Sequence, residues 1–217
     1  MPIVLKNLFK PGEIQAVRNA ALALPFEDGK RTAGRIAKAV KDNAQAAASH
    51  DRDALLDMVE RRLEADPTFQ AAALPRAFAK LMLTRTGPGQ HYGDHVDNAL
   101  IAGQRADLSF TLFLSDPDSY QGGELVIVDR VEDRAFKLEP GQALLYPSTT
   151  LHRVNPVSDG TRLVVIGWIT SWVRDPAQRE VLFDLAHALS RAEAAGDSEQ
   201  ILTLSKTRTN LLRMWAS

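Results

Sequence analysis

The sequence contains no cysteine among its 217 residues. Disulfide bonds, a thiolate nucleophile and cysteine-ligated zinc or iron–sulfur sites are therefore excluded. A metal ion bound by this chain must take its ligands from histidine, aspartate or glutamate.

An excess of charge of one sign and long apolar runs are also missing. The 26 basic and 27 acidic residues give a formal net charge of −1, which argues against a general binder of nucleic acid or of anionic membranes. No apolar run is long enough to span a bilayer, and the first residues lack the charged and apolar regions of a secretory signal. We therefore expect a cytoplasmic protein with neither nucleic acid nor membrane as a partner.

What remains is the composition of an ordinary globular protein, with 45% hydrophobic residues. The pattern along the chain predicts three regions. Residues 1–77 are predicted as an N-terminal helical support region, residues 78–174 as a jelly-roll core, and residues 175–217 as a C-terminal helical hairpin.

Apolar residues at helical spacing predict helices in the first region, over residues 11–24 and 51–66, with a short helical turn over 67–73. Residues 31–40 are compatible with a strand or a helix. We predict no chemistry in this region.

The last region is predicted as two helices. Asp175 is placed to cap the first and Gly196 to end it, and Asp197 or Ser198 caps the second. This apolar αα-hairpin can pack on the core or against a second copy of the chain, so a homodimer through these helices is a candidate assembly.

Between these regions, short apolar segments alternate with turn residues. Strands are predicted over residues 80–85, 108–114, 124–128, 135–138, 142–146, 150–155 and 162–169. Many short strands at close spacing favour an antiparallel double-sheet jelly roll, also called a double-stranded β-helix, over alternating βαβ units. The predicted fold class is α+β.

One histidine and one aspartate stand two positions apart in this core, at His95 and Asp97. On a strand, both side chains would point to the same face. His152, on a later strand, would supply a second imidazole. Two histidines and one carboxylate form a facial triad that leaves three metal positions open, which indicates a non-haem Fe(II) oxygenase. The His-x-Asp triplet alone is a weak signal, but it follows a Gly-rich loop and precedes the run of strands.

Arg162 adds a second signal. If residues 151–155 and 161–169 pair as a hairpin centred on Val157, Arg162 lies opposite His152 and shares its face. Both faces of that strand are apolar, so we expect Arg162 to point into the barrel, where a guanidinium needs an anion. A structural ion pair with a buried carboxylate, or exposure at the start of the strand, is the alternative. A dicarboxylate that reaches from Arg162 to the metal, such as 2-oxoglutarate, explains the placement better.

Residues 91–98, 120–125 and 147–168, with His152 and Arg162, resemble the PKHD-type hydroxylases, bacterial Fe(II)/2-oxoglutarate dioxygenases related to prolyl and lysyl hydroxylases. The resemblance is close over about residues 78–175. It implies His95, Asp97 and His152 as Fe(II) ligands, Arg162 as the anchor of 2-oxoglutarate, and O₂ as co-substrate, with ascorbate as a candidate reductant. It also implies hydroxylation of an unactivated C–H of an amino-acyl or peptide-like small molecule, with succinate and CO₂ as co-products.

One departure from this family concerns the co-substrate. Relatives often carry an Arg-Tyr pair before the Gly-rich loop, where this chain has Arg85-Thr86. Tyr92 is a candidate substitute and Thr111 a further candidate contact, although either is equally compatible with a place in the core. Asn98 is a candidate to orient Asp97, or it caps a turn.

Other functions remain open from the residues. His91 and His95 have the spacing of a helical zinc pair, but the glycines around them argue against a helix, so we reject a metalloprotease. A cupin-like metal isomerase or hydrolase would need no dicarboxylate anchor and would turn over without O₂. A non-catalytic iron or oxygen sensor would bind iron without consuming 2-oxoglutarate and would use the C-terminal helices to bind a partner.

Overall fold

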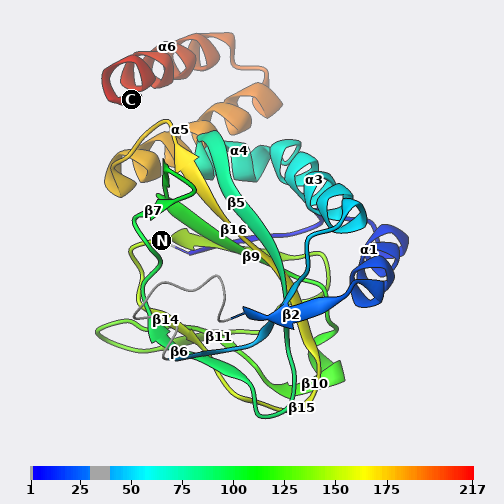
Figure 1. Cartoon of the computed structure of the whole chain (residues 1–217). Helices are drawn as coiled ribbons and strands as arrows, with labels where there is room; N and C mark the ends of the chain where they lie inside the picture. The colour runs from blue at the N-terminus through cyan, green and yellow to red at the C-terminus, as the bar shows by residue number, and fades with distance from the viewer. Residues whose placement is uncertain (1, 30–39) are drawn as a thin grey trace.

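The computed structural model describes residues 2–29 and 40–217. Two antiparallel sheets lie face to face, and helices cover the outer face of the larger sheet (Figure 1). The described helices are α1 (Pro11–Ala23), α3 (His50–Glu64), α4 (Pro67–Ala73), α5 (Pro176–Ala195) and α6 (Ser198–Trp215).

The larger sheet has seven strands in the described chain, in the order β1-β13-β9-β16-β5-β4-β2. They are β1 (Ile3–Leu5), β2 (Phe26–Asp28), β4 (Ala44–Ala46), β5 (Pro75–Thr86), β9 (Leu108–Phe113), β13 (Ala143–Pro147) and β16 (Arg162–Ser171). Side chains of the central strand β16 alternate between two cores. Leu163 and Val165 pack in the core under the helices, while Val164 and Ile166 pack in the core between the sheets.

The smaller sheet has the order β12-β11-β14-β6-β3. Its strands are β3 (Lys41–Asp42), β6 (His91–His95), β11 (Leu125–Ile127), β12 (Arg134–Phe136) and β14 (His152–Val154). Two further pairs join β7 (Leu100–Ile101) to β8 (Gln104–Arg105), and β10 (Tyr120–Gly122) to β15 (Val157–Gly160). The predicted jelly-roll core, with helices before it and a helical hairpin after it, is confirmed.

The first region is more than a helical support. Strands β1, β2 and β4 extend the large sheet and β3 extends the small one, so the division at residues 77 and 174 stays a prediction. Of the segment 31–40, for which the sequence allows strand or helix, residues 31–39 lie outside the described part of the chain.

The predicted hairpin between the strands of His152 and Arg162 is wrong. β14 pairs with β11 and β6 in the small sheet, whereas β16 pairs with β5 and β9 in the large one. The residues between them form β15, which pairs with β10 and carries the chain from one sheet to the other. His152 and Arg162 therefore belong to opposite walls of the sandwich rather than to neighbouring strands.

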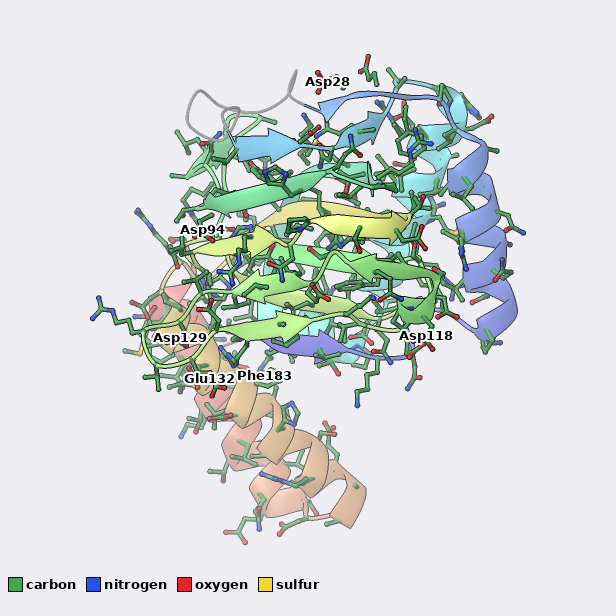
Figure 2. All side chains as sticks on the ribbon, turned by 90° about the horizontal axis from the view of Figure 1, so that it is seen from below. Asp28, Asp94, Asp118, Asp129, Glu132 and Phe183 are labelled. Atoms are coloured by element: carbon green, nitrogen blue, oxygen red, sulfur yellow. The ribbon has the colours of Figure 1, made fainter. Side chains whose placement is uncertain are left out.

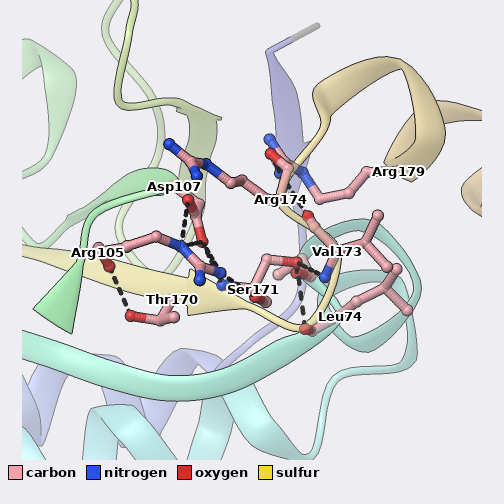
Figure 3. A network of polar contacts seen from close by, with 9 residues as sticks. Leu74, Arg105, Asp107, Thr170, Ser171, Val173, Arg174 and Arg179 are labelled. Atoms are coloured by element: carbon pink, nitrogen blue, oxygen red, sulfur yellow. Dashed lines mark hydrogen bonds and ion pairs between the residues drawn. The ribbon is translucent and has the colours of Figure 1, made fainter. Parts of the chain in front are cut away.

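A polar network joins the end of the large sheet to the C-terminal helices (Figure 3). The Asp107 carboxylate accepts hydrogen bonds from the Arg105 guanidinium and, at 2.9 Å, from the Ser171 backbone N–H. The buried Arg179 side chain donates to the carbonyl oxygens of Val173 and Arg174 at 2.7 and 2.8 Å. Because these partners satisfy a buried cation, the network fixes where α5 leaves the sheet.

The C-terminal hairpin begins and ends where the sequence predicts. Asp175 caps α5, Gly196 ends it in a left-handed conformation, and Asp197 caps α6. The hairpin extends beyond the sheets (Figure 2), and α6 has no buried residue. Among the described residues, no helix is long and apolar enough to cross a membrane, and the cytoplasmic location stays a prediction.

Candidate metal centre

The three predicted metal ligands converge from different parts of the chain. β6 ends at His95, β14 begins at His152, and these two residues are partners in the small sheet. One ligand atom from each histidine and from Asp97 lie within 4.8 Å of one another. Asp97 lies just beyond the end of β6 and not on it, so the strand geometry expected for the triplet is only partly present. The three side chains nevertheless form a group that could hold one metal ion.

Backbone carbonyl groups orient both imidazole rings. Nδ1 of His95 lies 2.8 Å from the Gly93 oxygen, and Nδ1 of His152 lies 2.9 Å from the Thr150 oxygen. A carbonyl can only accept a hydrogen bond, so each Nδ1 carries the proton and each Nε2 keeps its lone pair. Each Nε2 lies 4.0 Å from an oxygen of Asp97. The lone pairs are thus available to a metal beside the carboxylate.

The pKa of His95 supports this state. Burial and the neighbouring His152 ring lower it from 6.5 to about 4. The ring is therefore neutral near pH 7, which is the form that binds metals.

Asp97 is held by a serine that the sequence analysis missed. The Ser109 hydroxyl donates to Asp97 Oδ2 at 2.6 Å and lies 2.7 Å from the hydroxyl of Ser148. Ser109 is a polar residue on β9, and all six residues of this strand are buried. A polar residue within a predicted apolar strand was the sequence signal that could have identified Ser109. Asn98 lines the cavity described next, and its role in orienting Asp97 stays a prediction.

The centre opens into a cavity of about 350 Å³ between the two sheets, within the range of roughly 300–1,000 Å³ typical of small-molecule sites. One wall is formed by residues of β16, β5 and β9 on the face of the large sheet that points toward the small sheet. The other wall is formed by residues of the small sheet. Asp97 is the only carboxylate among the described residues that line it.

Arg162 lines the same cavity and is only 2% exposed. Its guanidinium carbon lies 5.4 Å from the centre of the Phe113 ring, and its Nε has no hydrogen-bond partner on any residue that the structure describes. Burial lowers the pKa of Arg162, while the nearby Tyr120 and Tyr146 hydroxyls raise it. Within the described chain, no carboxylate lies at ion-pair distance from Arg162, so the structure does not support a structural ion pair for it. A buried cation in this setting is suited to an anionic ligand.

The two candidate co-substrate contacts also line the cavity. The Tyr92 ring stacks on His95 with centroids 3.6 Å apart, and the Thr111 hydroxyl hydrogen-bonds with Tyr146, whose pKa burial raises. Tyr146 therefore keeps its proton and can donate a hydrogen bond.

Sequence reasoning missed three further residues of this cavity. Lys41 comes from the region in which we predicted no chemistry, and it lines the cavity because β3 pairs with β6 some 50 residues further along the chain. Trp168 also lines the cavity, and its Nε1 has no hydrogen-bond partner in the part of the chain that the structure describes. Thr86 replaces the expected tyrosine and lies beside Arg162 in the sheet.

Comparison with protein families identifies two matches. Residues 81–170 match the 2OG-Fe(II) oxygenase superfamily, and residues 176–217 match the C-terminal domain of PKHD-type hydroxylases. A PKHD-type hydroxylase from Parvibaculum lavamentivorans is 51% identical over 88% of this chain and 87% of its own. Another from Picosynechococcus is 44% identical over 98% of both chains.

Among solved structures, a viral collagen prolyl hydroxylase from Paramecium bursaria Chlorella virus-1, in complex with 2-oxoglutarate, has the same fold. The TM-score is 0.55 at 15% identity, over 78% of this chain and 96% of that one. At this identity, the likeness shows a shared fold alone.

Proposed function

Because the chain belongs to the PKHD-type hydroxylases of the 2OG-Fe(II) oxygenase superfamily, we propose that His95, Asp97 and His152 hold Fe(II) beside 2-oxoglutarate. The family is one of hydroxylases that use Fe(II), 2-oxoglutarate and O₂. One observation carries the assignment of roles. Three ligand atoms share a single cavity with a buried guanidinium that has no carboxylate partner in the described chain.

The charges of these residues fit both Fe(II) and 2-oxoglutarate. Fe(II) and the Asp97 carboxylate together carry one positive charge, and Arg162 adds a second. The two negative charges of 2-oxoglutarate balance the charges of Fe(II), Asp97 and Arg162. The neutral Nε2 atoms of the histidines suit Fe(II), which accepts imidazole and carboxylate ligands.

Each residue has a proposed task in catalysis. When bound, the iron supplies the oxidising power by which O₂ and 2-oxoglutarate convert a substrate C–H to C–OH, with succinate and CO₂ as co-products. Arg162 binds the distal carboxylate of 2-oxoglutarate, while Thr111 and Tyr92 contact the co-substrate. Ser109, together with Asn98, orients Asp97. Ascorbate is proposed as an external reductant that keeps the iron in its active state.

The substrate is proposed to be an amino-acyl or peptide-like small molecule. The fold is shared with a collagen prolyl hydroxylase, and the cavity has room for a side chain or a small molecule rather than for a folded protein. A homodimer through α6 is also proposed, because this helix packs mainly on α5 and leaves Leu202 and Met214 exposed.

An anaerobic titration of 2-oxoglutarate into the Fe(II)-loaded protein tests the function. We expect a saturable visible charge-transfer band. In Arg162→Ala, the dissociation constant for 2-oxoglutarate should rise roughly 30-fold or more, since truncating one partner of a buried charge pair costs about 2 kcal/mol or more. Arg85→Ala is the matched control, because this arginine lies over the Phe26 ring and not in the cavity.

A protein that binds iron but gives no band would contradict the proposal. Turnover without O₂ would then favour a cupin-like isomerase, and iron binding without consumption of 2-oxoglutarate would favour a sensor. An unchanged dissociation constant in Arg162→Ala would remove Arg162 from the co-substrate site.

A further inference from the structure

The cavity has two ends, and they differ in what they can bind. Arg162 and Trp168 lie on the same face of β16, six residues apart, which corresponds to roughly 20 Å along a strand. The Arg162 end is assigned to 2-oxoglutarate under the proposed function. The Trp168 end is therefore left for the substrate that is hydroxylated.

A continuous row of residues connects the metal centre to this second end. Trp168 pairs with Ser109 on one side and with Lys80 on the other, and Ser109 donates its hydrogen bond to Asp97. Neighbouring strands are about 4.8 Å apart, and Lys80 and Ser109 are separated by two such spacings. The backbones of these two residues are therefore roughly 10 Å apart across the sheet. A small molecule beside the metal would lie within reach of the lysine.

The charge at this end is positive. Lys80 and Lys41 line the cavity from opposite sheets, and the Lys41 ammonium lies 5.5 Å from the centre of the Tyr92 ring. Lys41 is also attracted by Asp97 and by Asp28 of β2, which does not line the cavity. For Lys80, no ion pair is found within the described residues, and residues 30–39 contain no acidic residue in the sequence.

Trp168 supplies an independent signal. The residue is 9% exposed, and its indole N–H has no acceptor among the described residues. A buried donor without an acceptor costs about 1–3 kcal/mol, and nearly all buried polar groups in proteins have a partner. Since the ring lines the cavity beside Lys80, the missing acceptor is expected on a ligand in the cavity.

Apolar residues border the same end. Val96 and Leu100 line the cavity and are 49% and 66% exposed, in the segment that runs from the end of β6 into the β7–β8 pair. Exposed aliphatic side chains at the edge of a pocket are suited to the apolar part of a ligand.

We propose that the substrate of this dioxygenase is an amphiphilic acid. Its oxyanion, a carboxylate or a phosphate, binds Lys80 and Lys41, an acceptor atom of the same molecule binds the Trp168 N–H, and its apolar part contacts Val96 and Leu100. This inference rests on the proposed function, because it takes the Arg162 end to be filled by 2-oxoglutarate.

The test uses the protein loaded with Fe(II) and 2-oxoglutarate without O₂. The probes are N-acetylated proline, leucine and phenylalanine, the carboxamides of the same compounds, and phosphate monoesters of similar size. Binding is read from the shift of the charge-transfer band and from tryptophan fluorescence. A probe that abolishes the band has displaced 2-oxoglutarate and is scored as a competitor and not as a substrate mimic.

We expect at least one class of acid to shift the band and the uncharged carboxamides to have no effect, and the active class identifies the oxyanion as carboxylate or phosphate. Lys80→Gln should weaken the binding about tenfold, as loss of one charge contact does. Arg85→Gln, which removes the same charge from the opposite face of β5, should bind as the unchanged protein does. Trp168→Phe should also weaken binding, and the band itself should remain in all three variants.

Three results would overturn the inference: equal binding of acids and carboxamides, unchanged binding in Lys80→Gln, or no response to any acid. In each case the presence of the charge-transfer band would show that the proposed function still holds. Absence of the band in the unchanged protein would instead contradict the proposed function. In that case, tryptophan fluorescence on the iron-loaded protein still decides whether acids bind at Lys80.

Discussion

At the residue scale, the protonation of two ring nitrogens controls what the centre can bind. The backbone oxygens of Gly93 and Thr150 keep the proton on Nδ1 of His95 and His152. The Nε2 lone pairs therefore need no proton transfer before a metal binds. Sequence alone places His152 on a strand and allows one at His95, but it does not identify which nitrogen is available.

His95→Ala is expected to abolish stoichiometric Fe(II) binding, because it leaves one histidine and one carboxylate at the centre. Metal content after dialysis against Fe(II) without O₂ measures this. His91→Ala is the control, since His91 lies on the same strand but does not line the cavity. Full iron occupancy in His95→Ala would contradict the proposed ligand set.

The metal-free protein should lose stability as the pH falls from about 6.5 to about 4. The upper limit is the ordinary pKa of histidine, and the lower limit is the lowered pKa of His95 in the folded protein. In this window, the unfolded chain binds a proton that the folded His95 does not, so the free energy of unfolding falls with pH. Urea unfolding of the chelator-treated protein at several pH values measures the slope. His95→Gln should show a shallower slope, and an unchanged slope in this variant would contradict the assignment.

At the scale of elements, the crossover between the sheets sets the position of Arg162. β15 pairs with β10 and ends at Gly160, just before β16 begins at Arg162. Gly160 has φ +74°, and a Cβ at this position would collide with the Ser119 carbonyl oxygen. A glycine is therefore required where the chain changes sheets.

Gly160→Ala is expected to destabilise the fold by about 1–3 kcal/mol, from a strained backbone and a steric collision. Chemical denaturation compares it with the unchanged protein. Gly12→Ala is the control, because a Cβ there meets no atom within 4 Å and its φ is not positive. Equal stability of the two variants would show that the crossover tolerates a side chain.

At the scale of the whole molecule, the C-terminal hairpin is joined to the sandwich mainly at its base. A small core of Leu74, Val173 and Leu182 contacts partly buried residues of α6, and the network around Asp107 and Arg179 fixes the start of α5 (Figure 3). The outer surface of α6 remains exposed, which makes it the proposed surface for a second copy.

Leu202→Glu is expected to convert a dimer to a monomer, because it places a charge on a residue that is 71% exposed on α6 and would be buried between copies. Light scattering during size-exclusion chromatography gives the mass. Val131→Glu, at a residue 95% exposed and outside α6, should leave the mass unchanged. A monomer before any substitution would remove the proposed homodimer.

The sequence by itself determined the main helices, most strands of the core and the kind of chemistry of the chain. The period of apolar residues predicts α1, α3 and the central strand β16, since each period follows from local backbone geometry. The absence of cysteine and the residues His95, Asp97 and His152 predict the kind of metal centre, because ligand type depends on side-chain chemistry alone.

Only the tertiary structure decided which of these residues meet. The sequence pattern is compatible with a hairpin that pairs the strands of His152 and Arg162, but β15 carries the chain to the opposite sheet. Lys41, Lys80 and Trp168 come together through pairings between distant strands and across two sheets. Such contacts depend on global packing and long-range register, which no local period in the sequence encodes.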